Sequence, residues 1–258
     1  MPNVFGWVYP SVVMGPRHRW LALPLLLAGI ALVAQPVGAT SAATTGQYIH
    51  GLANRLLLVA VPITLLVEGL LFYAIWRFSR NEEATPTRDR RRLEIGWTVA
   101  TALILLFVGV SAYGVMAHPA VTPTQSDVTQ ALHAPGTVVI NVTGSQWYWT
   151  FTYPQYNVTT QGSVEFPAGR QLVLRITSTD VIHSVFIPKM GIKKDAIPGK
   201  TNYELTTVSN ASVGHQYVLF CAEYCGVGHS DMRATVNVVS PSQFHGWIRN
   251  QTASSSGA

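Results

Sequence analysis

The sequence contains few charged residues for its length. Lys, Arg, Asp and Glu make up 11% of its 258 residues, whereas about 25% is usual for a soluble domain. Hydrophobic residues reach 48%, so the shortage of charge indicates membrane segments. A nucleic-acid-binding surface is excluded, because six of the seventeen basic residues lie in the stretch 77–92 and the region from 118 onward is nearly neutral.

The first apolar run, residues 21–34, is too short to cross a membrane. It has 14 residues, where a membrane helix needs about 20, and it follows the basic segment RHR. Val37 and Ala39 suit the −3 and −1 positions of a cleavage site, so residues 1–39 are predicted to be a signal peptide and the mature chain to begin near Thr40. A short uncleaved anchor is the alternative, and Met14 offers a second start codon.

Two further runs, residues 56–76 and 95–117, are long enough to span a hydrocarbon core about 30 Å thick. They predict a transmembrane hairpin over 50–118, with the arginine-rich loop 77–93 in the cytoplasm and everything after it outside. Glu94, at the start of the second span, suits a helix N-terminus. Glu68 lies inside the first span, where ionisable groups are functional candidates, but its role cannot be assigned.

The region 119–245 lacks long helical patterns and is rich in short alternating segments. Six of them, broken by turn residues, are predicted strands of an antiparallel sandwich or barrel: 137–143, 146–153, 171–177, 202–208, 216–220 and 234–239. Residues 246–258, ending in NQTASSSGA, are predicted to be a disordered tail.

The aromatic segment SQWYWTFTY lies in one of these predicted strands. Alternation places Trp147, Trp149 and Tyr153 on one face and Tyr148 on the other. We expect Trp149 to pack inside the sandwich, because large aromatic rings dominate protein cores.

Cysteine is scarce, and both thiols lie in the stretch FCAEYCGVGHSDM. The absence of C-x-x-C-H excludes a c-type haem attached to this chain. A disulfide between Cys221 and Cys225 would close a short loop with little entropic benefit, and a zinc site would leave Met232 without a role. Thiolate, imidazole and thioether groups suit copper, and His183 and His229 supply imidazoles. Mononuclear blue copper uses one cysteine, so the second thiol implies a second metal ion.

The spacing C-x-E-x-C-x-x-x-H-x-x-M, preceded by DVIHS and KKDAIPGK, resembles the binuclear copper (CuA) domain of cytochrome c oxidase subunit II. The segments QWYWTFTYP and LEIGWT are similar to that family's aromatic strand and second helix. The resemblance implies a two-helix transmembrane hairpin followed by an all-β, cupredoxin-like Greek-key sandwich. Val185 and Ser145 depart from the family pattern, and neither position is a ligand.

The resemblance also implies a role for each site residue. Two copper ions are expected, with both thiolates as bridges, one histidine on each ion, and a thioether and a backbone carbonyl as weak ligands: Cys221, Cys225, His183, His229, Met232 and Glu223. The Glu223 side chain would face a magnesium ion at a subunit interface. Trp147 would be the residue through which electrons enter, and Glu94 the mouth of a proton path.

These roles imply subunit II of a terminal haem-copper cytochrome c oxidase. It would accept electrons from cytochrome c or another external donor and pass them to haem in subunit I, where oxygen is reduced to water. Subunit III and membrane lipid would be further partners. The chain would lie in a prokaryotic plasma (inner) membrane as a multi-pass protein, with its copper domain on the periplasmic side.

Two other functions remain open from the sequence. A membrane-anchored copper chaperone or thiol-redox protein could use C-x-x-x-C with a remote histidine, although it would need a thioredoxin-like α/β domain. A quinol-oxidase subunit of the same fold would be expected to lack the copper ligands.

Overall fold

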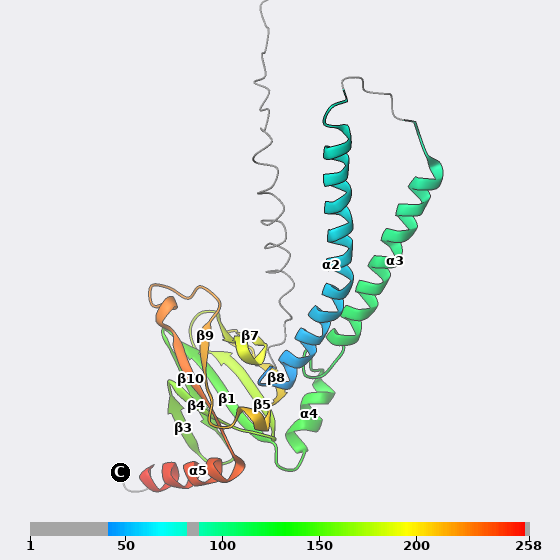
Figure 1. The fold of residues 1–258 in the computed structure, drawn as a ribbon. Helices are drawn as coiled ribbons and strands as arrows, with labels where there is room; N and C mark the ends of the chain where they lie inside the picture. Colours follow the sequence, from blue (N-terminus) through cyan, green and yellow to red (C-terminus); the bar gives the residue numbers. More distant parts are fainter. Residues whose placement is uncertain (1–40, 82–87, 256–258) are drawn as a thin grey trace, which may run out of the picture. The chain divides into compact units, whose positions relative to one another are not determined.

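The computed structural model describes residues 41–81 and 88–255, so the predicted signal peptide lies outside the described residues. Two long helices come first, α2 (Thr44–Phe78) and α3 (Arg91–Met116), as Figure 1 shows. By length and composition both are able to cross a membrane, and their apolar side chains are almost entirely uncovered by the rest of the chain. At 1.5 Å per residue α2 is about 52 Å long, so it projects beyond a hydrocarbon core of about 30 Å.

The segment after the helices forms a β-sandwich of two five-stranded sheets. The first sheet has the order β3-β2-β1-β5-β8, with strands Val158–Gln161, Tyr148–Tyr153, Val138–Ser145, Gln171–Ser178 and Asn202–Thr207. The second has the order β4-β10-β9-β6-β7, with strands Ser163–Pro167, Arg233–Val239, Gln216–Cys221, His183–Ile187 and Ile192–Ala196. Together with the two helices, this is the predicted hairpin plus cupredoxin-like sandwich.

Two strand pairs correct the expectation of a purely antiparallel sandwich. β1 pairs with β5 in parallel, and β4 pairs with β10 in parallel. The chain crosses to the opposite sheet between such partners, so a strand returns beside an earlier one in the same direction. Alternation along a segment indicates which face is buried but carries no information about strand direction.

The core lies between the sheets and contains the aromatic side chains of β2. Trp149, Phe151 and Tyr153 are fully buried, which confirms the prediction for Trp149. Trp147 was predicted to lie in this strand on the same face as Trp149, and that placement is wrong. The pairing of β1 with β2 ends at Ser145 and Tyr148, so Trp147 lies in the turn between the two strands. It is 39% exposed.

A C-terminal helix replaces most of the predicted disordered tail. Residues Pro241–Ser255 form α5, which lies across one end of the sandwich (Figure 1). Phe244 and Ile248 are buried, and the Trp247 ring centroid lies 5.2 Å from that of Tyr153. The apolar residues at spacings of three and four give the helix one buried face, a signal that the polar ending obscured.

A short helix, α4 (Gln125–His133), was also not predicted. It begins at a capping box, in which the Thr124 hydroxyl accepts from the Asp127 backbone N–H and the Asp127 carboxylate accepts from that of Thr124. Val128 packs on Leu205 and Val173, so α4 covers the outer face of the first sheet.

The first turn of α2 is attached to the sandwich through a buried carboxylate. Glu204 of β8 is 1% exposed, and its Oε1 accepts a 2.7 Å hydrogen bond from the Thr45 hydroxyl. The Lys194 ammonium lies 3.4 Å from Oε2. Burial raises the pKa of Glu204 above its usual value, although Lys194 and Thr45 oppose the shift. This carboxylate also complements the N-terminal end of the α2 dipole, since the first turn of α2 holds no acidic residue.

Candidate metal centre

Strand register places one histidine beside one cysteine. Cys221 ends β9 and His183 begins β6, and these strands pair with Val185 opposite Cys221. The backbone N–H of Ala222 continues the pairing by donating to the Ser184 carbonyl at 3.0 Å. As a result, His183 Nδ1 lies 3.8 Å from Cys221 Sγ.

The loop between β9 and β10 supplies the remaining groups, at the end of the sandwich opposite α5 (Figure 1). Cys225 Sγ lies 3.8 Å from Cys221 Sγ, 3.6 Å from His229 Nδ1 and 3.7 Å from Met232 Sδ. The Glu223 carbonyl lies 3.2 Å from Cys221 Sγ. All six groups that the sequence singled out therefore converge.

Asp180 fixes the orientation of His183. Its Oδ1 accepts from His183 Nε2 at 2.9 Å, and its Oδ2 accepts from the Gln146 backbone N–H at 2.7 Å. Burial alone would raise the pKa of Asp180, but hydrogen bonds from His183, Gln146, Val181 and Ser178 lower it to about 2. The ionised carboxylate only accepts, so Nε2 carries the proton and Nδ1 presents its lone pair to Cys221.

Most of the cluster is screened from water. His183 and Met232 are completely buried, and Cys225 and Cys221 are 3% and 8% exposed. Burial, with a contribution from the neighbouring Cys221, raises the pKa of Cys225 to about 11. A thiol binds metal only as thiolate, so metal binding here would release protons.

The donor set fits copper. The two cysteines are free thiols, and with His183 they form a group whose donor atoms all lie within 4.8 Å of one another, close enough to hold an ion. Sulfur and imidazole donors suit copper, and a carboxylate on the far nitrogen of the histidine is the usual support for a metal ligand.

Trp147 and Gln146 lie directly over the loop 222–232, which carries Cys225. The Trp147 indole N–H and the Gln146 side-chain amide both donate to the Cys225 carbonyl, at 3.1 Å and 2.7 Å. The Trp147 ring rests on Gly228, where an added Cβ would lie 2.5 Å from Trp147 Cδ2. The partly exposed indole is therefore held against the loop 222–232 by its hydrogen bond to the Cys225 carbonyl and by its contact with Gly228.

Sequence reasoning missed four residues of this site. Asp180 and Gln146 orient the cluster, and Gly144 and Gly228 make room for rings. A Cβ on Gly144 would lie 2.9 Å from the His183 ring. The neighbouring DVIHS motif could have drawn attention to Asp180, but no signal in the sequence links Gln146 to a loop almost eighty residues away.

The other acidic residues that the sequence singled out lie outside the thiol cluster or at its edge. Glu94 lies in the first turn of α3, away from the thiols, and Glu68 is exposed on α2. The Glu223 side chain is half-buried beside the cluster.

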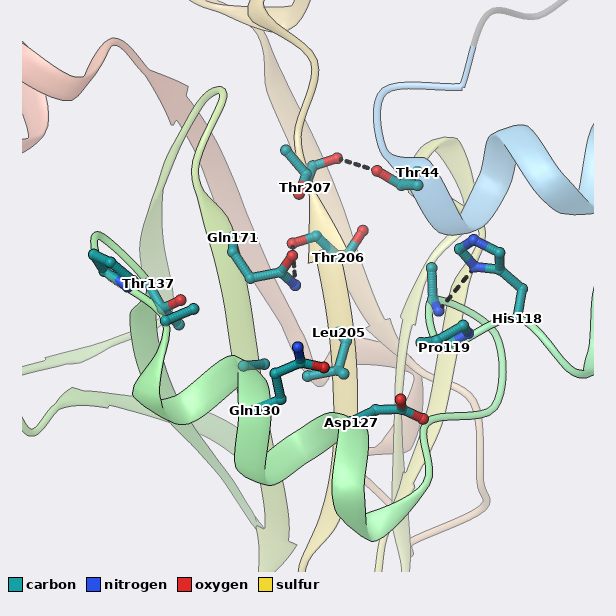
Figure 2. A pocket seen from close by; sticks show the side chains of 14 residues that line it. Thr44, His118, Pro119, Asp127, Gln130, Thr137, Gln171, Leu205, Thr206 and Thr207 are labelled. Atoms are coloured by element: carbon teal, nitrogen blue, oxygen red, sulfur yellow. Dashed lines mark hydrogen bonds between the residues drawn. The ribbon is translucent and has the colours of Figure 1, made fainter.

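Two cavities in the described part of the chain lie outside the thiol cluster. One, of about 380 Å³, is lined by a mixture of polar and apolar side chains between α4, β8 and the start of α2 (Figure 2). The other lies between α2 and α3.

Comparison with known proteins places the chain in a family. Residues 158–239 match the model described as cytochrome c oxidase subunit II, periplasmic domain, and residues 33–115 match that family's transmembrane domain. A Rickettsia prowazekii protein named "Probable cytochrome c oxidase subunit 2" is 31% identical over 232 residues, covering 80% of this chain and 70% of its own length. The chain belongs to the cytochrome c oxidase subunit II family.

Other members of the family are similarly related. Cytochrome c oxidase subunit 2 of Cereibacter sphaeroides is 27% identical over 248 residues, covering 81% of this chain and 77% of its own. The crystal structure of the periplasmic domain of subunit II from Bradyrhizobium japonicum is 26% identical, with a TM-score of 0.43, and covers 45% of this chain and 94% of that one. As a subunit II protein, the chain is part of an oxidoreductase assembly and is anchored in a membrane.

Proposed function

We propose that this chain is the electron-accepting subunit of a terminal haem-copper cytochrome c oxidase. The observation that supports this is the convergence of two free thiols, two imidazoles, a thioether and a carbonyl at one end of the sandwich. Cys221 and Cys225 would bridge two copper ions, and His183 and His229 would each supply an imidazole ligand to one of them. Met232 and the Glu223 carbonyl would be weak ligands.

A copper pair in this centre would accept and release one electron at a time, with the charge shared between the two ions. The protein would hold the donor atoms in place in both redox states. Asp180 fixes the His183 ring, and Cys221 is fixed by β9, so little rearrangement would be needed on electron transfer. The buried surroundings keep water away from both thiolates.

Trp147 is the proposed point of contact with the donor. Its ring is partly exposed, and its N–H bonds directly to the Cys225 carbonyl. A donor such as cytochrome c would meet the indole face and pass its electron inward through this contact. Tyr224 and Val227, at 80% and 88% exposure, extend an apolar surface on the same loop.

The remaining roles concern the partner subunits. Electrons would pass to haem in subunit I, where oxygen is reduced to water, and subunit III would complete the assembly. The half-buried Glu223 carboxylate would bind a magnesium ion at the subunit I interface, and Glu94 would open a proton path into subunit I. We place the loop 77–93 in the cytoplasm and the sandwich, residues 119–255, on the periplasmic face of a prokaryotic plasma membrane, after removal of residues 1–39.

The fold argues against the copper-chaperone or thiol-redox alternative. Such a protein would need a thioredoxin-like α/β domain, whereas the connections between strands in 138–239 contain only short 3₁₀ turns. Met232 and the Trp147 contact would also have no role there.

The experiment that tests the proposal is copper analysis with EPR on residues 119–255, a range that keeps α5. We expect two coppers per chain and a seven-line mixed-valence pattern. Cys225→Ser should lose the pattern, because one bridging sulfur cannot hold the pair equivalently. Val227→Ala, on an exposed position of the same loop, is the matched control. One copper per chain with a four-line signal in the unchanged protein would refute the binuclear centre.

A further inference from the structure

A cavity lies between the two long helices at the end where they meet the sandwich. Its volume is about 570 Å³, within the range of small-ligand sites. Gln47, Tyr48, Gly51 and Arg55 of α2 line it, together with Ser111 and Gly114 of α3. The Tyr48 ring centroid lies 3.7 Å from that of His118, which lines the neighbouring cavity (Figure 2).

The lining carries hydrogen-bond donors and one positive charge. Arg55 is the only charged residue of the lining, and the lining contains no acid. Among the residues that the structure describes, ion pairs are formed by His183 and Lys194 and not by Arg55. Gln47, Tyr48 and Ser111 add an amide and two hydroxyls. Such a set suits an anion with several acceptor oxygens.

Two glycines open the cavity as far as the helix backbones. A Cβ added to Gly51 or to Gly114 would meet no atom within 4 Å. The space between α2 and α3 at this level is therefore left unfilled by the chain. A bulky group is able to enter between the helices at the height of Arg55.

The depth of Arg55 identifies the kind of anion. It directly precedes the apolar run 56–76, whose 21 residues span about 31 Å, the thickness of a hydrocarbon core. The guanidinium therefore lies at the boundary between acyl chains and headgroups. The anion present throughout that layer is the phosphodiester of a phospholipid, which a guanidinium binds bidentately.

We propose that this cavity binds the headgroup phosphate of one anionic membrane phospholipid. Arg55 pairs with two phosphate oxygens, and Gln47, Tyr48 and Ser111 donate to the others. The net charge of the lining favours a lipid such as phosphatidylglycerol, because no carboxylate is present to pair with the amine of a zwitterionic headgroup.

The test measures lipid bound to the complete oxidase complex by native mass spectrometry. Complexes are stripped of loosely bound lipid with detergent and then titrated with phosphatidylglycerol or phosphatidylcholine. Arg55→Gln is expected to lose one tightly bound phosphatidylglycerol and to bind it about tenfold more weakly, the effect of one charge-assisted pair. The control is Arg77→Gln, at the opposite end of the same helix, which should keep the lipid.

Other outcomes are equally decisive. If Arg55→Gln does not assemble, Arg55→Lys and Ser111→Ala should each show weaker but measurable lipid binding. Equal binding by the unchanged and variant complexes would overturn the proposal. So would displacement of the lipid by excess inorganic phosphate, which would reveal a free-anion site, or a cross-link between position 55 and a carboxylate of a partner subunit.

Discussion

The contact between Gly228 and Trp147 provides a sharp test of electron transfer through the indole. Gly228 has φ −90° and ψ 9°, so an alanine adopts this backbone without strain. Its Cβ would nevertheless lie 2.5 Å from Trp147 Cδ2 and 2.6 Å from Cγ. To return to an ordinary contact of 3.4 Å, the ring must retreat by roughly 0.9 Å.

A movement of that size breaks the hydrogen bond between Trp147 and the loop that carries Cys225. The Trp147 Nε1 to Cys225 carbonyl distance is 3.1 Å, and it would lengthen to about 4 Å, beyond hydrogen-bonding range. We expect the overpacking and the lost bond to cost about 1–3 kcal/mol of stability. A misplacement of about 1 Å is able to slow a reaction on the order of 100-fold. Gly228→Ala should therefore slow electron transfer from the reduced donor by about that factor, with copper content and EPR unchanged.

Stopped-flow oxidation of the donor, with copper analysis and EPR on the same samples, measures this effect. Trp147→Leu should also slow transfer by orders of magnitude, and the double variant should be no slower than Trp147→Leu alone, because both changes act through one ring. Gly246→Ala, in α5, is the matched control. A normal rate in Gly228→Ala, or strictly additive effects in the double variant, would refute the reasoning.

The remaining predictions concern the attachment of the helices to the sandwich and their orientation in the membrane. Thr45→Val removes a donor from the buried Glu204 carboxylate, so the chain in detergent should lose about 1.5–3 kcal/mol of unfolding free energy. The folded pKa of Glu204 is raised, so its contribution to stability is complete below the usual value of 4.5 and is lost as pH rises through the folded pKa. Denaturant unfolding across pH should show that loss in the unchanged chain and not in Glu204→Gln; equal pH profiles would contradict it. For orientation, protease added outside intact cells should cleave beyond residue 118 and spare the loop 77–93, and the purified chain should begin near Thr40; peptides from residues 1–30 would show that the leader is retained.

The elements that the sequence predicted are those with a local signal. The two long helices follow from runs of apolar residues, and six strands follow from alternation over five to eight residues. The cluster around Cys221 and Cys225 was predictable because five of its six groups lie within twelve residues. The helices α4 and α5 were missed, since α4 is short and mostly polar and the apolar face of α5 depends on a few residues around Phe244.

The missed parts of the site depend on contacts between distant segments. Gln146 meets the Cys225 carbonyl across 79 positions, and the Gly144 backbone makes room for the His183 ring. Neither relation leaves a periodic or spacing signal. The parallel pairing of β1 with β5 is hidden for the same reason, since strand direction depends on how the chain crosses between sheets.

The segment from Cys221 to Met232 carries most of the candidate site, so a change of this one segment would change most of the donor groups. Five of the six candidate donor groups lie in this single stretch, which runs from the last residue of β9 to the residue before β10, and its ends are joined by the hydrogen bond from the Cys221 N–H to the Met232 carbonyl at 3.1 Å. Loops tolerate exchange far better than the strands that carry them. This stretch differs from an ordinary surface loop, because Cys221, Cys225 and Met232 are buried in the hydrophobic core of the sandwich. Exchanging it would remove five candidate donor groups at once and would also require the core at this end to repack around His183, which stays in place on β6.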